Sequence, residues 1–95
     1  MNDIVVQDDR KHHTVLVWWT ATPGSFSEAV SEFEAAILSE AGREKGIRSI
    51  RINVSASGAF GMVNISESIA RSGGNEWLDA IRFIEDAANK AFKDK

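Results

Sequence analysis

The first part of the chain contains two hydrophobic segments with the composition of β-strands. Residues 14–22, TVLVWWTAT, are β-branched and aromatic, and five of them in a row are apolar on both faces. Such a run is typical of a strand in the middle of a sheet, where both faces are covered. A shorter apolar run, Ile4-Val5-Val6, predicts a strand within residues 2–8, and the polar DDRKHH segment predicts a turn between the two.

Two later segments have helical periodicity. Pro23-Gly24 ends the second strand, and SFSE at residues 25–28 is a capping box that begins a helix. This helix is predicted to stop at Gly42 or to run to Gly46. A second helix is predicted from Asn75, a good N-cap residue, to the C-terminal lysines. The apolar stripes are Phe26, Val30, Phe33 and Ile37 in the first helix, and Trp77, Ile81, Ile84, Ala88 and Phe92 in the second.

A β-hairpin is predicted between the helices. Residues 47–57 alternate cleanly, with isoleucines and valine on one face and Arg51 and Asn53 on the other. Gly58-Ala59 forms the turn, and a second strand follows over residues 60–70. The core-facing residues are predicted to be Ile50, Ile52, Val54, Ala56, Val63 and Ile65. The residues predicted to point away from the core are Arg51, Asn53, Ser55, Ser57, Phe60, Met62 and Asn64.

The order β-β-α-β-β-α predicts an α+β protein that forms a single domain over residues 1–95. Both helices fit on one face of a mainly antiparallel four-stranded sheet, which gives a two-layer sandwich. The layout is expected to be ferredoxin-like, or a permuted form in which the usual last strand has moved to the front.

The adjacent residues Trp18 and Trp19 predict a functional surface. Neighbours in a strand point to opposite faces, so one indole enters the core and the other lies on the face without helices. An exposed apolar patch marks an interaction surface more often than chance. We therefore expect a non-enzymatic protein that binds a protein partner, with a homodimer as one form of this. The candidate residues on this face are Trp18, Trp19, Arg51, Asn53, Phe60 and Met62.

The segment GAFGMVNI, residues 58–65, is similar to a strand motif of RNA-recognition domains, in which a basic residue precedes Gly-Phe-Gly-Phe-Val-x-Phe. The matches are Phe60, Gly61 and Val63, and the departures are Gly58, Ala59, Met62 and Ile65. The resemblance implies a sheet that binds single-stranded RNA or DNA by stacking bases on exposed rings, at about 1–3 kcal/mol per base. The motif keeps one stacking ring here, so an ordinary strand explains the segment more simply.

Acidic residues predict an alternative binding surface on the helices. The net charge is −3, so the chain lacks the overall basic excess that is typical of proteins that bind duplex nucleic acid. Size, acidity and the lack of a catalytic motif also fit a small inhibitor or immunity-type protein, such as the phage anti-CRISPR proteins, that binds a nucleoprotein complex. Solvated helix faces explain the same acids without a partner. The acidic candidates are Glu28, Glu32, Asp79 and Asp86.

The sequence gives no motif for catalysis, metal or cofactor binding. His12 and His13 are the two histidines, and neighbours in an extended chain point apart and do not chelate one metal together. Residues 72–75, SGGN, lack the lysine of a phosphate-binding loop. We expect no enzyme activity, metal or cofactor. Without a signal peptide or a membrane-length apolar run, we expect a cytoplasmic protein that does not bind membranes.

Overall fold

The computed structural model describes residues 4–20, 26–55, 58–72 and 74–93. Its strands are β1 (Ile4–Asp9), β2 (Thr14–Trp19), β3 (Ile47–Ser55) and β4 (Gly58–Ile65). Its α-helices are α1 (Phe26–Ile37), α2 (Glu40–Glu44), α3 (Glu67–Arg71) and α4 (Glu76–Ala88). A 3-10 turn, η1 (Arg10–His12), joins β1 to β2, and a π-helical turn, η2 (Asn89–Lys93), continues α4.

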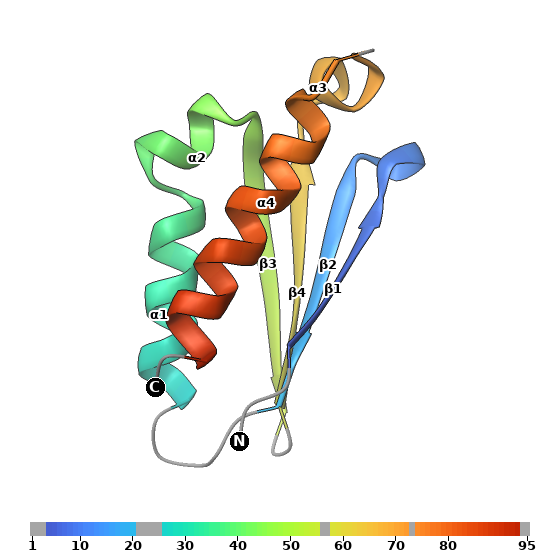
Figure 1. The fold of residues 1–95 in the computed structure, drawn as a ribbon. Helices are drawn as coiled ribbons and strands as arrows, with labels where there is room; N and C mark the ends of the chain where they lie inside the picture. The colour runs from blue at the N-terminus through green and yellow to red at the C-terminus, as the bar shows by residue number, and fades with distance from the viewer. Residues whose placement is uncertain (1–3, 21–25, 56–57, 73, 94–95) are drawn as a thin grey trace.

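The strands form one antiparallel sheet in the order β1-β2-β4-β3. Figure 1 shows α1 and α4 side by side across one face of this sheet. The predicted α+β class, with an antiparallel four-stranded sheet and helices, is therefore confirmed, and β2 is a central strand as its composition indicates. The finer expectation, a ferredoxin-like or permuted layout, stays a prediction.

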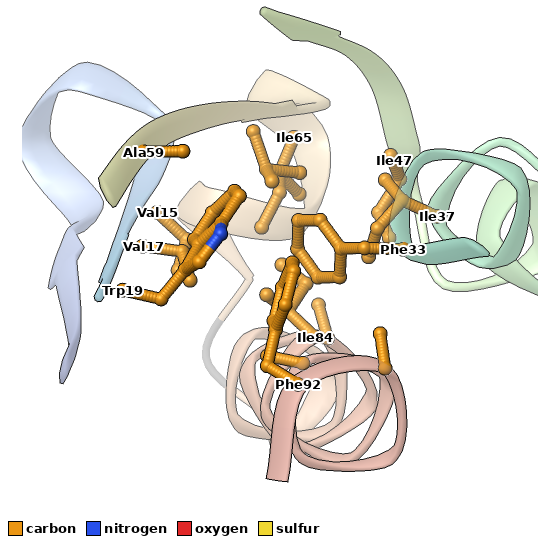
Figure 2. Close-up of a cluster of buried hydrophobic side chains, with 14 of the residues drawn as sticks. Val15, Val17, Trp19, Phe33, Ile37, Ile47, Ala59, Ile65, Ile84 and Phe92 are labelled. Atoms are coloured by element: carbon orange, nitrogen blue, oxygen red, sulfur yellow. The ribbon is translucent and has the colours of Figure 1, made fainter. Parts of the chain in front are cut away.

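The hydrophobic core lies between the sheet and the helices. In Figure 2, the side chains of Trp19 from β2, Phe33 from α1 and Phe92 from η2 face one another. The Trp19 ring stacks on Phe92 with 4.2 Å between the centroids, and it meets Phe33 edge-on at 5.6 Å. Aromatic pairs of this kind add about 0.5–1.5 kcal/mol each beyond simple burial. The helical layer therefore packs on the inward-facing Trp19 through Phe33 of α1 and Phe92 of η2.

The predicted single helix up to Gly42 or Gly46 is wrong in its second half. α1 ends at Ile37, and α2 begins after Ser39, whose hydroxyl accepts a hydrogen bond from the Gly42 amide. The same hydroxyl donates to the Ala36 carbonyl at 2.7 Å. A serine that bonds its own backbone in this way competes with a continuous helix. A Cβ at position 42 would lie 2.0 Å from the Ile37 carbonyl oxygen, so the tight corner requires glycine.

The predicted turn at Gly58-Ala59 is wrong, because both residues belong to β4 and pair with Ser55 and Val54 of β3. The predicted strand over residues 60–70 also extends too far. β4 ends at Ile65, and Ser66 begins α3 by accepting a hydrogen bond from the Ile69 amide. The expected core position of Val54 is also wrong, since this side chain is 61% exposed. It lies near the end of the edge strand β3 and is not packed against the core cluster.

The predicted ends of the two helices have mixed outcomes. Asn75 stands at the N-cap of α4 but makes no side-chain capping bond. The predicted capping residue Ser25 of the first helix lies outside the described residues.

Two predicted positions of the first hairpin strand also lie outside the described residues. They are Ala56, predicted to face the core, and Ser57, predicted to face away from it.

Gly46 allows the chain to turn from α2 into β3. Its φ of +92° lies in the left-handed region, where a side chain is strained. A Cβ there would also come within 2.5 Å of Cγ1 of Ile69. Glycine is therefore required at this junction for two independent reasons.

Arg10 links the β1–β2 hairpin to the helical layer through side-chain hydrogen bonds. Its Nε donates to the Ala70 carbonyl and its Nη2 to the Ser72 carbonyl, both at 2.6 Å. The guanidinium carbon lies 5.9 Å from the centroid of the Trp77 ring, and the Trp77 indole donates to Asp8 at 3.2 Å. These charge-assisted and cation–π contacts join the start of the chain to the beginning of α4.

Candidate functional site

The face of the sheet that points away from the helices, here called the open face, is a regular grid of side chains. Cross-strand partners lie side by side on the same face, and along each strand the faces alternate. The grid has three rows, which are Val5, Trp18, Phe60 and Asn53; Gln7, Leu16, Met62 and Arg51; and Asp9, Thr14, Asn64 and Ser49. Five of the six residues predicted for this surface therefore belong to one contiguous area, and they are Trp18, Arg51, Asn53, Phe60 and Met62.

Trp18 and Phe60 form the aromatic centre of the open face. They are register partners on the two central strands, and their ring centroids are 5.1 Å apart with 43° between the planes. Trp18 is 37% exposed, and Val5, beside it on β1, is 57% exposed. Leu16 and Met62 extend the apolar area in the next row, where both are half-buried.

Trp19 is not part of this surface. Its side chain is 2% exposed and packs among the core aromatics, so its place in the candidate set is corrected. The sequence showed that the two indoles diverge but not which one enters the core. The burial pattern of β2 shows that Trp19 is the indole that enters the core, because it shares its face with the buried residues Val15 and Val17.

Polar side chains border the apolar centre on the β3 side. Arg51 and Asn53 are exposed on this edge strand, in register with Met62 and Phe60. Further along, the Asn64 amide donates to the Ser49 hydroxyl at 2.9 Å. Arg51 lies in the row next to that of Trp18, and it is available for a partner carboxylate or phosphate.

The two glycines of GAFGMVNI lie close to Trp19, Gly58 to its backbone and Gly61 to its ring. A Cβ at Gly58 would lie 2.3 Å from the Trp19 carbonyl oxygen, and one at Gly61 would touch the Trp19 ring at 3.4 Å. Close approach to the β2 backbone at Gly58 and to the Trp19 ring at Gly61 thus explains the glycines without a ligand. Sequence reasoning missed that Trp18 is the direct partner of Phe60 and that Val5 adjoins it. Pairing the strands in register was the signal that would have found both.

The acidic candidates lie on helices of the other layer. Glu28 is exposed and Glu32 is half-buried on α1. Asp79 and Asp86 line a groove of about 450 Å³ between α1 and α4. Its other lining residues are Ala36, Lys45, Arg82, Phe83, Ala87 and Lys90. The groove carries both signs of charge, so it is not an acidic surface.

The histidines lie at the end of the β1–β2 hairpin, where His12 Nδ1 is 2.8 Å from an Asp9 carboxylate oxygen. His13 adopts the left-handed conformation that ends η1. In the part of the chain that the structure describes, no three His, Asp or Glu side chains lie together as metal ligands would.

Glu76, in the first turn of α4, has a pKa below its ordinary value. The main cause is the Ser72 hydroxyl, which donates to the carboxylate at 2.7 Å, and a backbone hydrogen bond adds to it. The position suits a carboxylate, because the N-terminal end of a helix favours negative charge.

Comparison with known proteins finds no protein-family model, curated protein or solved structure that matches this chain. None of the described helices is long and apolar enough to cross a membrane.

Proposed function

We propose that this chain is a non-enzymatic binding protein whose working surface is the open face. The observation that carries the proposal is the Trp18–Phe60 pair, which lies on the face opposite the helices and is joined by Val5, Leu16 and Met62. Interfaces are enriched in tryptophan and arginine, and their energetic centres are aromatic residues ringed by polar ones. The open face has this composition, with Arg51 and Asn53 at its border.

A protein is the partner that this surface suits best. Aromatic and aliphatic side chains provide the apolar centre, while the polar groups at the β3 edge can pair with a complementary rim. Arg51 is the one cation among the described residues of the three open-face rows. A single cation gives little attraction for a phosphate backbone, since nucleic-acid affinity depends on several such contacts.

This proposal is tested by replacing one exposed apolar side chain on the open face and one on the helical layer by alanine and comparing the effects on binding. The tagged protein is used to capture partners from its host, and the captured protein is identified and purified. Its Kd is then measured against the unaltered chain and the variants Trp18→Ala, Phe60→Ala and Leu78→Ala. Trp18→Ala removes the centre of the open face, whereas Leu78→Ala removes a side chain of α4 that is 51% exposed. We expect Trp18→Ala to weaken binding by about thirtyfold, as for a hot-spot residue. Leu78→Ala should bind like the unaltered chain.

The proposal fails if Trp18→Ala and Phe60→Ala both bind the purified partner with unchanged Kd. Circular dichroism of each variant shows whether the fold is retained, so that lost binding is not confused with unfolding. If only Leu78→Ala weakens binding, the helical layer is the working surface instead.

A second candidate function, binding of single-stranded nucleic acid, draws on the same pair of rings. Two aromatic side chains on adjacent central strands offer faces for stacked bases, and Arg51 lies in the neighbouring row. A fluorescence titration with a short single-stranded RNA at low and high salt tests it. Binding that weakens with salt and is lost in Phe60→Ala supports this function, and no binding at low salt ends it.

A further inference from the structure

The open face carries opposite charges on its two outer strands. Asp9 lies on β1 at one edge, and Arg51 lies on β3 at the other, separated by the two central strands. Among the described residues of the three rows, Asp9 is the one acidic residue and Arg51 is the one basic residue. The rest of the rows is neutral, so the face has one edge with an acid, whose carboxylate also contacts His12 of the same chain, an apolar centre, and one edge with a cation.

We propose that the partner of the open face is the open face of a second copy of this chain, related by a two-fold axis parallel to the strands. This inference rests on the proposed function and names the partner for it. Rotation about such an axis sets β1 of one copy opposite β3 of the other, and β2 opposite β4. Each acidic edge then faces a basic edge, and the aromatic centres meet.

The alternative axis is disfavoured by charge. A two-fold axis perpendicular to the strands would set β3 over β3, which brings the two Arg51 side chains together at one end of the interface. Like charges in an interface are costly and suppress the wrong arrangement. The parallel axis places Gln7 directly opposite Arg51 of the other copy, because both belong to the same row, and Asp9 lies one row away.

The size of the face sets the expected strength. Strands lie about 4.8 Å apart and rise about 3.3 Å per residue, so the open face covers on the order of 400 Å² in projection. A standard stable interface buries about 800 Å² of accessible surface on each partner. The dimer is therefore expected at the weak end of specific complexes, with a Kd in the micromolar range. Two sheets packed in this way lie about 10 Å apart with their strands nearly aligned.

Two charge variants test both the interface and its axis. Gln7→Arg places a cation directly opposite Arg51 of the other copy, and Arg51→Glu places an acid opposite Gln7 and one row from Asp9 of the other copy. Both altered positions are exposed, and neither residue takes part in the η1 cap made by Asp9. Each variant alone should weaken self-association by about threefold to thirtyfold, since two symmetric contacts change in each dimer.

A mixture of the two variants provides the decisive comparison. In the mixed dimer, the new arginine at position 7 faces the new glutamate at position 51, while Arg51 of the first copy keeps its place opposite Gln7 and one row from Asp9 of the second. Sedimentation of the unaltered chain from about 10 µM to about 1 mM should show a concentration-dependent dimer. The mixture should recover the dimer affinity that each variant loses alone, and Arg82→Glu, a charge reversal on α4, should dimerise normally.

Three results overturn the inference. The first is a chain that stays monomeric over the whole concentration range. The second is a dimer that Trp18→Ala leaves unchanged, which would place the contact elsewhere. The third is a dimer that needs Trp18 but shows no recovery in the mixture, which rules out the parallel axis. In the first case the proposed function survives if Trp18→Ala still abolishes binding to a different captured protein, so the two failures can be told apart.

Discussion

Two adjacent tryptophans should have very different effects on stability. Trp19 is 2% exposed and contacts Phe33 and Phe92 in the core, whereas Trp18 is 37% exposed and contacts Phe60 on the open face. Replacing each by alanine removes the same atoms from neighbouring positions of β2. The difference in unfolding free energy therefore reports which face is covered in solution.

The expected sizes follow from burial. Tryptophan buries about 150–250 Å² when enclosed, at about 25 cal/mol per Å². For Trp18, with 37% of its surface exposed, this gives an upper bound of about 2.5–4 kcal/mol. Neighbouring side chains on an open surface can close over the gap, so we expect Trp18→Ala to cost about 1–2 kcal/mol. Trp19→Ala also leaves a cavity, and such changes cost about 3–5 kcal/mol.

Urea unfolding followed by far-ultraviolet circular dichroism measures both values without relying on tryptophan fluorescence. The chains are compared in dilute solution, so that self-association adds nothing to stability. The expected gap of about 2 kcal/mol corresponds to about 8–16 °C in Tm for a domain of this size. Equal losses for the two variants would refute the reasoning, because Trp18 would then be enclosed as fully as Trp19.

Three further changes test other parts of the structure. Arg10→Ala removes the bonds to the carbonyls of Ala70 and Ser72 and should cost about 1–2 kcal/mol by urea unfolding, with Arg10→Lys recovering part of it. Gly46→Ala should cost at least about 1–2 kcal/mol by the same assay, owing to its positive φ and the crowding at its Cβ; an unchanged midpoint would contradict this. Ser72→Ala should raise the pKa of Glu76 in an NMR titration, because the hydroxyl that lowers this pKa is lost. In the unaltered chain, ionised Glu76 contributes to folding stability at pH values above its ordinary pKa. That stability is lost as the pH falls through the lowered pKa.

The predictable part of the fold was the part that periodicity encodes. Alternation identified Val63 and Ile65 as inward and Phe60 and Met62 as outward, and this is confirmed by their burial. The helical stripe likewise identified Phe33 and Ile84 as core residues. In both cases a single pattern repeats over several residues and is reinforced by burial of one face.

The missed features depend on single side chains and on tertiary contacts. Ser39 and Ser66 begin the short helices α2 and α3 through one hydroxyl each, and no periodic signal marks such a cap. The exposure of Val54 follows from the edge position of β3, which the order of the strands determines. The pairing of Trp18 with Phe60 required the register between strands that lie far apart in the sequence.

The most direct test of the open face uses fluorine NMR of the chain labelled with 5-fluorotryptophan. The protein has three tryptophans, and two of them, Trp19 and Trp77, are 2% exposed. A Trp18→Phe variant assigns the third signal. On binding a partner or on raising the concentration, the Trp18 signal should move while the signals of Trp19 and Trp77 stay in place. Association that leaves the Trp18 signal unchanged would contradict the claim that the open face is the working surface.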